Sequence, residues 1–166
     1  MSLSVFIKTF GCQMNEYDSN RFFELLKNTF NFSRTVIESE ADLFILNTCS
    51  VREKSYFKVF SILGKWKLLK ESKPAIIIII LGCVAKQLGV SFFSYAPFVD
   101  FVLGPQSYTK FPDLLISFFL SKRVQHIVAS NVIEKFSCLS ISYKTSSIIG
   151  FVTIMEGCSK FCSYCV

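Results

Sequence analysis

Three cysteines near the carboxyl terminus have the spacing of a metal-binding loop. Cys158, Cys162 and Cys165 form the pattern C-x-x-x-C-x-x-C within the run M-E-G-C-S-K-F-C-S-Y-C. Cysteine thiolate is the usual ligand of iron–sulfur clusters. Three thiolates on one loop can hold three irons of a 4Fe–4S cluster and leave the fourth iron open. A partial zinc site is the alternative, but it would normally need a fourth Cys or His nearby, and the only histidine is His126.

Three further cysteines are far apart in sequence but share a position relative to predicted strands. Cys12, Cys49 and Cys83 close the segments T-F-G-C, L-N-T-C and I-L-G-C. Because the carboxyl ends of parallel strands meet at one edge of a sheet, these thiols could meet and ligate a second cluster. Cysteine is also among the most often buried residue types, so position alone leaves ligation and simple burial equally open. Cys138 matches neither pattern, and we interpret it as an incidental thiol.

The elements that must position these cysteines alternate between strand and helix. Strands are predicted where short apolar runs are bounded by turn residues, and helices where apolar residues recur every three or four positions. The predicted strands are 5–10, 42–47, 75–81 and 99–103, and the predicted helices are 15–30, 51–70 and 108–120. This alternation, with fully apolar strands, predicts an α/β fold in which a parallel sheet is flanked by helices.

The alternating pattern weakens after residue 121. We interpret residues 122–147 as a linker, and residues 148–155 predict one more apolar strand before the carboxyl-terminal cysteines. The expected organisation is a complete α/β domain over 1–121, the linker, and the opening strand and cluster loop of a second domain over 148–166. We expect the remainder of that second domain to be missing, which would make the chain a truncated piece.

Composition limits the classes of function. The longest aliphatic run, 76–81, is far shorter than the roughly 20 residues of a membrane-spanning helix. The amino terminus lacks the features of a secretory signal, so we expect a cytoplasmic protein. In a reducing compartment, seven cysteines favour metal binding over disulfides. The net charge of +6 permits a nucleic-acid partner, although the basic residues are scattered.

Four other residues have plain structural interpretations. Asn15 and Asp18 follow Cys12 and are expected at the start of a helix, where Asn and Asp favour caps. Trp66 is expected to pack in the core rather than to stack on a base. We expect His126 at the surface.

Together, five separated motifs resemble the methylthiotransferase family of radical S-adenosylmethionine enzymes. In chain order they are I-K-T-F-G-C-Q-M-N-E-Y-D-S, A-D-L-F-I-L-N-T-C-S-V-R-E-K, L-G-C-V-A, V-D-F-V-L-G-P-Q and I-M-E-G-C-S-K-F-C-S-Y-C-V. Within the family, Q-M-N-E-Y-D-S and T-C-S-V-R-E-K are most similar to the branch that modifies N6-isopentenyladenosine in tRNA, beside the anticodon.

The resemblance implies two ligand sets. They are Cys12, Cys49 and Cys83 for an auxiliary 4Fe–4S cluster, and Cys158, Cys162 and Cys165 for the radical cluster, whose open iron would bind S-adenosylmethionine. The implied reaction replaces the C2–H of the adenine by a methylthio group. An unactivated C–H bond is beyond ordinary acid–base side chains, so the cofactors must carry this chemistry. No catalytic side chain is assigned.

The resemblance also sets expectations about partners. It implies tRNA as substrate and a reductant protein such as a flavodoxin, in a monomer without membrane attachment. We expect this chain to be inactive by itself, since the remainder of the second domain is expected to be missing. The alternative is a stand-alone iron–sulfur or metal-binding α/β module without catalysis.

Overall fold

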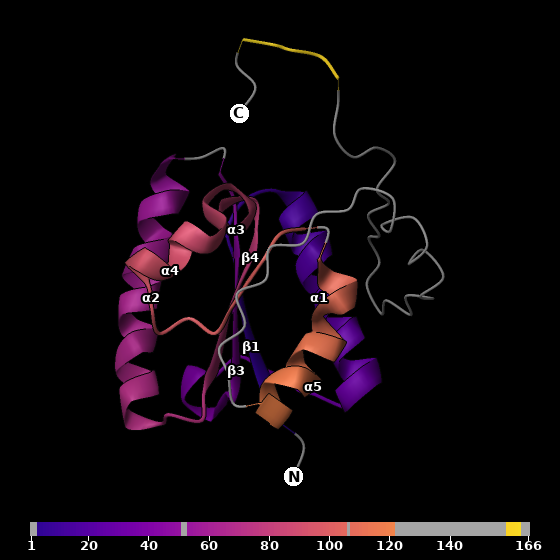
Figure 1. The fold of residues 1–166 in the computed structure, drawn as a ribbon, viewed down its shortest axis with the longest axis vertical. Coiled ribbons are helices and arrows are strands. Elements are labelled where there is room, and N and C mark those ends of the chain that lie inside the picture. The colour runs from indigo at the N-terminus through magenta and orange to yellow at the C-terminus, as the bar shows by residue number, and fades with distance from the viewer. Residues whose placement is uncertain (1–2, 51–52, 106, 122–158, 164–166) are drawn as a thin grey trace.

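A five-stranded parallel sheet forms the centre of the protein, with helices on both faces (Figure 1). The computed structural model describes residues 3–50, 53–105, 107–121 and 159–163. The strands lie in the order β2-β1-β3-β4-β5, and every neighbouring pair is parallel. Their bounds are Ser4–Thr9 for β1, Ser33–Thr35 for β2, Leu43–Thr48 for β3, Ile77–Gly82 for β4 and Phe101–Leu103 for β5. The predicted α/β class is confirmed.

The helices form a layer on each side of the sheet (Figure 1). They are α1 (Gln13–Phe30), α2 (Glu53–Ser72), α3 (Cys83–Leu88), α4 (Phe92–Tyr95) and α5 (Phe111–Ser121), with short 3-10 turns at Glu38–Glu40, Gly89–Ser91 and Tyr108–Lys110. Helices α1 and α5 pack on one face, and α2, α3 and α4 on the other. Among the described residues, no helix is both long and apolar enough to cross a membrane.

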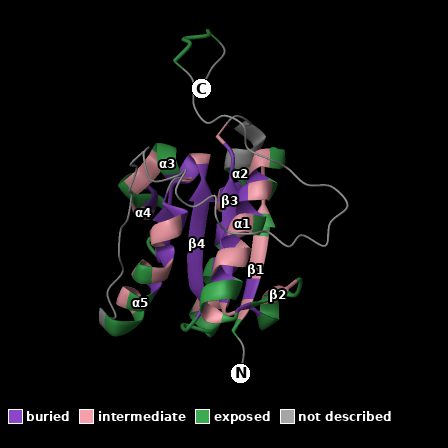
Figure 2. Ribbon diagram, turned by 90° about the vertical axis from the view of Figure 1, so that its right-hand side faces the viewer, coloured by how far each residue is buried: buried purple, intermediate pink, exposed green. Residues whose placement is uncertain are grey.

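Each face of the sheet carries its own apolar core. Side chains of β3 alternate between the two, because successive residues of a strand point to opposite faces: Phe44 and Leu46 belong to one core, and Leu43 and Ile45 to the other. All residues of β3 and β4 are buried (Figure 2). A strand covered on both faces must be apolar throughout, which explains the continuous isoleucine run of β4.

Trp66 is the largest side chain buried on the α2 face. It is 1% exposed, and its ring centroid lies 5.0 Å from that of Phe44 and 6.1 Å from that of Phe6. The tilted and edge-on geometries are those that aromatic quadrupoles favour. The expected packing role of Trp66 is therefore confirmed.

The predicted long elements are present, with ends that differ by at most three residues. Strand β2 and helices α3 and α4 were not predicted, because three to six residues are too few to show periodicity. The short 3-10 turn Tyr108–Lys110 opens the predicted helix 108–120, and α5 itself begins at Phe111. The predicted linker 122–147 and strand 148–155 lie outside the described residues.

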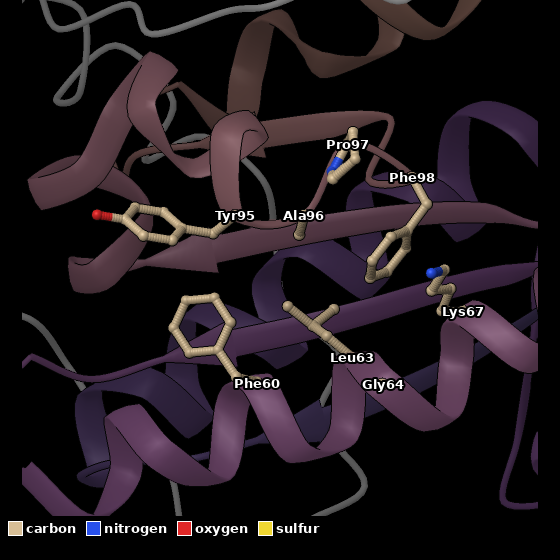
Figure 3. A pocket seen from close by; sticks show the side chains of 8 residues that line it. All are labelled: Phe60, Leu63, Gly64, Lys67, Tyr95, Ala96, Pro97 and Phe98. Carbon is tan, nitrogen blue, oxygen red and sulfur yellow. The ribbon is translucent and has the colours of Figure 1, made fainter.

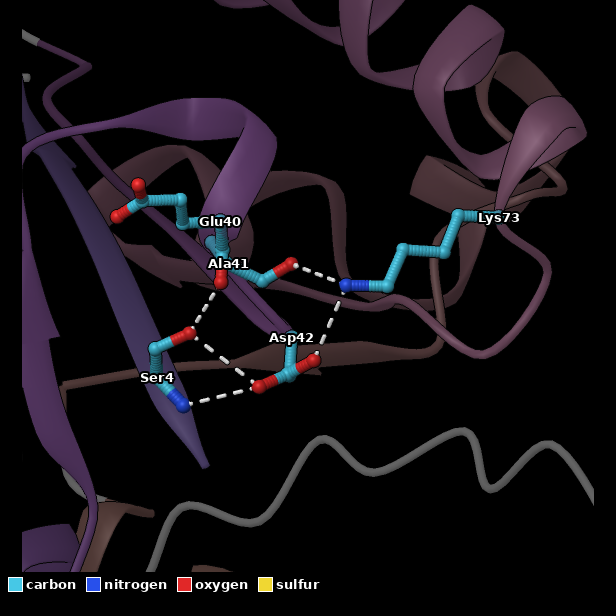
Figure 4. A network of polar contacts seen from close by, with 5 residues as sticks. All are labelled: Ser4, Glu40, Ala41, Asp42 and Lys73. Atoms are coloured by element: carbon cyan, nitrogen blue, oxygen red, sulfur yellow. Dashed lines mark hydrogen bonds and ion pairs between the residues drawn. The ribbon is translucent and has the colours of Figure 1, made fainter. Parts of the chain in front are cut away.

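Polar side chains fasten the amino edge of the sheet, where the strands begin (Figure 4). The carboxylate of Asp42, just before β3, accepts the backbone N–H of Ser4 at 3.0 Å and lies 3.1 Å from Lys73 Nζ. On the α2 face, Lys70 forms an ion pair with Asp100 before β5. The same carboxylate accepts the backbone N–H of Ile78 at 2.8 Å. These contacts stabilise the sheet at the edge opposite to the one where the cysteines lie.

Candidate metal centre

Three cysteines lie at the carboxyl edge of the sheet, on neighbouring strands. Cys12 follows β1 and is the residue preceding α1, Cys49 directly follows β3, and Cys83 directly follows β4 as the first residue of α3. Strands β1, β3 and β4 are adjacent and parallel. The topology therefore brings the three residues to one edge, as the sequence predicted. Their role as ligands stays a prediction.

The three thiols differ in exposure, and two of them act electrostatically on the third, Cys83. Cys49 is buried, Cys83 is half-buried and Cys12 is exposed, and none of these three forms a disulfide. Burial and the neighbouring Cys49 and Cys12 raise the pKa of Cys83, while the backbone N–H of Ser50 acts in the opposite direction. The influence of Cys49 and Cys12 on Cys83 agrees with the position of all three at one edge of the sheet. A thiol of raised pKa becomes a good ligand once a positive metal displaces its proton.

Two glycines allow the strand ends to come this close. Gly11 has φ +132°, and a Cβ there would lie 2.7 Å from Cys49 Cβ. Gly82 has φ +91°, and a Cβ there would overlap Asn47 Oδ1 and the carbonyl oxygen of Thr48. Both the backbone angle and the contact distances require glycine. Each glycine immediately precedes one of the cysteines, so the turns that present Cys12 and Cys83 depend on them.

A buried network of amides and hydroxyls lies next to the thiols. Cys12 Sγ donates to Asn15 Oδ1 at 3.3 Å, and Asn15 Nδ2 donates to Asn47 Oδ1 at 3.1 Å. Asn47 Nδ2 donates in turn to Ser19 Oγ at 2.9 Å, and Ser19 Oγ lies 2.8 Å from Thr9 Oγ1. The network links the end of β1, the first turns of α1 and the end of β3.

Sequence reasoning missed this network. Asn15 and Asp18 stand at the start of α1, as expected, although neither is the cap, because the N-cap position is Cys12 and no side chain caps α1. Both residues lie in the first turns of α1 and are buried. A signal was available at Asn47, an amide at the end of the otherwise apolar run D-L-F-I-L-N. A buried amide requires hydrogen-bond partners, and the partners come from α1.

The thiols of Cys12, Cys49 and Cys83 can be compared with the ligands of known kinds of metal centre. Among the described residues, no three Cys, His, Asp or Glu side chains are grouped as ligands of a single metal ion. A tetrahedral ion bound by three thiolates would need sulfurs roughly 4 Å apart, given Zn–S bonds of ~2.3 Å. A cluster of four irons is larger than one ion and takes ligands that stand farther apart. The chemistry of three free thiols is that of iron–sulfur ligands, and their joint ligation of a cluster stays a prediction.

The carboxyl-terminal cysteines fall mostly outside the described residues. Cys162 is described and exposed, whereas Cys158 and Cys165 are not described. Cys138 and His126 also lie outside the described residues. The second predicted ligand set therefore stays a prediction.

Two hollows in the described surface have no cysteine in their lining. One, of about 310 Å³, opens between α2 and the segment that joins α4 to β5 (Figure 3). Its lining is mainly aromatic and aliphatic: Phe60, Leu63, Gly64, Lys67, Tyr95, Ala96, Pro97 and Phe98. The other, of about 290 Å³, is polar and lined by Thr9, Glu16, Ser19, Asn20 and Arg34.

The amino-acid sequence matches a known protein family over most of the described domain. Residues 4–104 match the family described as Uncharacterized protein family UPF0004, and the chain belongs to this family. It is 48% identical over its 166 residues to the tRNA-2-methylthio-N(6)-dimethylallyladenosine synthase of Colwellia psychrerythraea. It is 47% identical over the same length to the protein of that name from Burkholderia ambifaria. The chain spans 34% and 36% of these relatives, about a third of their length. The resemblance to methylthiotransferases found in the motifs is confirmed.

Proposed function

We propose that this chain forms the amino-terminal domain of a tRNA methylthiotransferase, of the kind named tRNA-2-methylthio-N(6)-dimethylallyladenosine synthase. The observation that carries the proposal is the gathering of Cys12, Cys49 and Cys83 at one sheet edge. It occurs in a chain that is 48% identical to a relative of that name. The proposed reaction adds a methylthio group to C2 of N6-isopentenyladenosine, beside the tRNA anticodon.

In this proposal the three strand-end thiols hold an auxiliary 4Fe–4S cluster. When bound, such a cluster would supply sulfur for the methylthio group. The exposure of the thiols suits this role: Cys49 is 4% exposed and anchored at the end of a fully buried strand, whereas Cys12 is exposed. Ligation from the buried side would leave one side of the cluster open to a substrate.

Cys158, Cys162 and Cys165 are the proposed ligands of a second 4Fe–4S cluster that binds S-adenosylmethionine. Their support is the spacing C-x-x-x-C-x-x-C and the lack of a histidine within thirty residues of Cys158, since His126 is the only one in the chain. The proposed partners are tRNA, to which the net charge of +6 is favourable, and a reductant protein such as a flavodoxin. We propose a cytoplasmic monomer without membrane attachment.

The experiment that tests the function is a domain exchange. Residues 1–121 of this chain replace the equivalent segment of the Colwellia psychrerythraea relative, and the chimera is expressed in cells that lack their own enzyme. Mass spectrometry of the tRNA should show the 2-methylthio nucleoside. A Cys83→Ala chimera should lose the product, whereas Val90→Ala, on an exposed position seven residues further on, should retain it.

The same experiment distinguishes the proposed transferase from the alternative, a stand-alone iron–sulfur module. A chimera that folds and binds iron but yields no methylthiolated tRNA would contradict the transferase proposal and favour a stand-alone iron–sulfur module. Product formed equally well by the Cys83→Ala chimera would contradict the assignment of the auxiliary ligands.

A further inference from the structure

The charged residues of the two helical layers are unevenly divided. Helices α2, α3 and α4 carry six lysines and two glutamates, whereas α1 and α5 carry two basic and four acidic residues. Lysines that are scattered along the sequence therefore gather on the α2 layer of the fold (Figure 1). A basic face of this kind attracts the phosphates of a nucleic acid.

Most of the described lysines on these helices are open to water and have no carboxylate partner. The exposed ones are Lys58, Lys65, Lys67 and Lys86. Lys67 lies 3.9 Å from Glu71, while the other three form no ion pair among the described residues. Lys70 differs from them, since it is partly buried and pairs with Asp100. The exposed lysines therefore remain available to an anionic partner.

The aromatic hollow opens on the same layer, between α2 and the segment that joins α4 to β5 (Figure 3). The rings of Phe60, Tyr95 and Phe98 line it, and Lys67 lies at the end away from Tyr95. The Phe60 ring stacks at 5.8 Å on Phe92, which is fully buried, so this wall of the hollow is firmly held. Tyr95 is 62% exposed and its ring lies 6.0 Å from that of Phe60. The hollow thus offers ring surface that the fold leaves uncovered.

Gly64 keeps the hollow open on the side of α2. It is one of the lining residues, in the middle of the helix, and a Cβ there would meet no atom within 4 Å. Glycine within a helix costs about 1 kcal/mol relative to alanine, and no close packing requires it at this position. The space of about 310 Å³ is at the small end of the range for ligand pockets, which suits one flat ring.

We propose that the α2 layer is a docking surface for an unpaired stretch of RNA, in which one nucleobase enters the aromatic hollow and the exposed lysines contact the phosphates. Proteins that bind single strands combine these two features: aromatic rings that stack on bases, and a positive surface along the backbone. A peptide segment would also fill an apolar hollow, but it would not need the excess of lysines on this layer. The inference rests on the proposed function only in that RNA, rather than DNA, is taken as the strand.

Helix α2 connects this surface to the candidate metal centre. The helix begins at Glu53, four residues after Cys49, and its 20 residues span about 30 Å. An RNA strand that lies along α2 therefore extends toward the sheet edge where the cysteines gather. The surface would hold the strand outside the reacting nucleotide, because the lining of the hollow contains no cysteine.

The test measures the binding of a fluorescein-labelled oligouridylate of about twelve nucleotides to the full chain, by fluorescence anisotropy. Tyr95→Ala removes an exposed ring, and Gly64→Leu fills the hollow from a position where a new Cβ meets no atom. Phe119→Ala is the matched control, since it removes a ring of 57% exposure from α5, on the opposite layer. Circular dichroism shows that each variant is folded.

Tyr95→Ala and Gly64→Leu should each bind the RNA about tenfold more weakly, as expected for the loss of one stacked base. Phe119→Ala should bind like the original chain. RNA affinity that is unchanged in both hollow variants would overturn the inference and favour a protein segment as the occupant. A loss in Phe119→Ala as large as that in Tyr95→Ala would overturn it too, since the binding would then not be specific to the α2 layer.

The lysines are tested by the dependence of the affinity on salt. Lys67→Gln should lower the slope of log affinity against log salt concentration by about 0.7, the amount for one phosphate contact on a single strand. Lys27→Gln, which removes an exposed lysine from α1, should leave the slope unchanged. Equal slopes for Lys67→Gln and the original chain would overturn the phosphate contact at the hollow.

The outcome is separable from that of the proposed function. Cys83→Ala should bind the oligouridylate like the original chain, because Cys83 is not part of the docking surface. Undiminished binding in both hollow variants, with a domain-exchange chimera that makes methylthiolated tRNA, would overturn this inference and leave the proposed function standing. Binding that depends on the hollow, with a chimera that makes no product, would support this inference and contradict the proposed function.

Discussion

Thr48 Oγ1 donates a 2.6 Å hydrogen bond to the carbonyl oxygen of Leu81, and so joins the last residues of β3 and β4 just before Cys49 and Cys83. Thr48 and Leu81 are both fully buried. The bond adds to the parallel register, in which Thr48 pairs with Gly82. The separation of these two cysteines is therefore set by the rigid centre of the sheet.

Thr48→Val tests the contribution of this bond to stability. Valine has nearly the shape of threonine but lacks the hydroxyl, so the change removes one buried hydrogen bond, which is worth about 1 kcal/mol. We expect the free energy of unfolding, measured by urea denaturation of the metal-free chain, to fall by about that amount. Ser72→Ala, which removes an exposed hydrogen bond to Leu69, should change it by less than about 0.5 kcal/mol. A Thr48→Val chain as stable as the original would show that the bond contributes nothing.

Gly82→Ala tests the close approach of the strand ends. The new Cβ would collide with Asn47 Oδ1 and the Thr48 carbonyl, and the left-handed φ of +91° adds backbone strain. We expect a loss of about 3 kcal/mol in the free energy of unfolding.

The matched control for this change is Gly64→Ala, in the middle of α2. A Cβ there meets no atom within 4 Å, and alanine is the better helix former by about 1 kcal/mol. The control should therefore be slightly more stable than the original chain. Thermal unfolding followed by circular dichroism compares the two, and a Gly82→Ala melting temperature equal to that of the original chain would contradict the argument.

The main layers of the fold follow from local signals, whereas the contacts of the site do not. The isoleucine run of β4 and the spacing of Phe22 and Leu26 in α1 are visible in the sequence, because burial on one or both faces imposes a pattern. The contact between Asn15 and Asn47 joins residues 32 positions apart. It depends on the register of β1 against β3, which no single segment determines. The sequence therefore predicted the edge where the cysteines gather and the place of Asn15 at the start of a helix, but not its contact with Asn47.

Asp100→Ala tests the buried ion pair on the α2 face. The carboxylate is 10% exposed, pairs with Lys70 and accepts the backbone N–H of Ile78. Removing it leaves the buried N–H of Ile78 without its acceptor and the Lys70 ammonium with only the carbonyl oxygen of Phe98, which should cost about 3 kcal/mol in the free energy of unfolding. Glu71→Ala breaks the exposed pair with Lys67, at 59% and 55% exposure, and should cost less than about 0.5 kcal/mol. Equal losses from the two changes, measured by urea denaturation, would show that burial does not strengthen the pair.

The free energy of unfolding should depend on pH through the carboxylate of Asp42, at the amino edge of the sheet (Figure 4). Partial burial by itself would raise the pKa of Asp42, but the backbone N–H of Ser4 and the ammonium of Lys73 outweigh it, so the pKa lies below its ordinary value. The unfolded chain then binds the proton more readily than the folded chain. The stabilisation is complete above the ordinary carboxyl pKa and is lost as the pH falls through the lowered one.

Asp42→Asn should therefore lower the free energy of unfolding at pH 6.5, and the difference from the original chain should shrink as the pH falls below about 4. Because the Asp42 and Lys73 side chains are 35% and 46% exposed, solvent screening limits the difference to less than about 1 kcal/mol. Urea denaturation of both chains at pH 6.5 and at a pH below about 4 measures this difference. In a Lys73→Met background the difference at pH 6.5 should be smaller, since the attraction that lowers the pKa is gone, while the bond from Ser4 remains. A difference of the same size at both pH values would show that the ionised carboxylate does not stabilise this edge of the sheet.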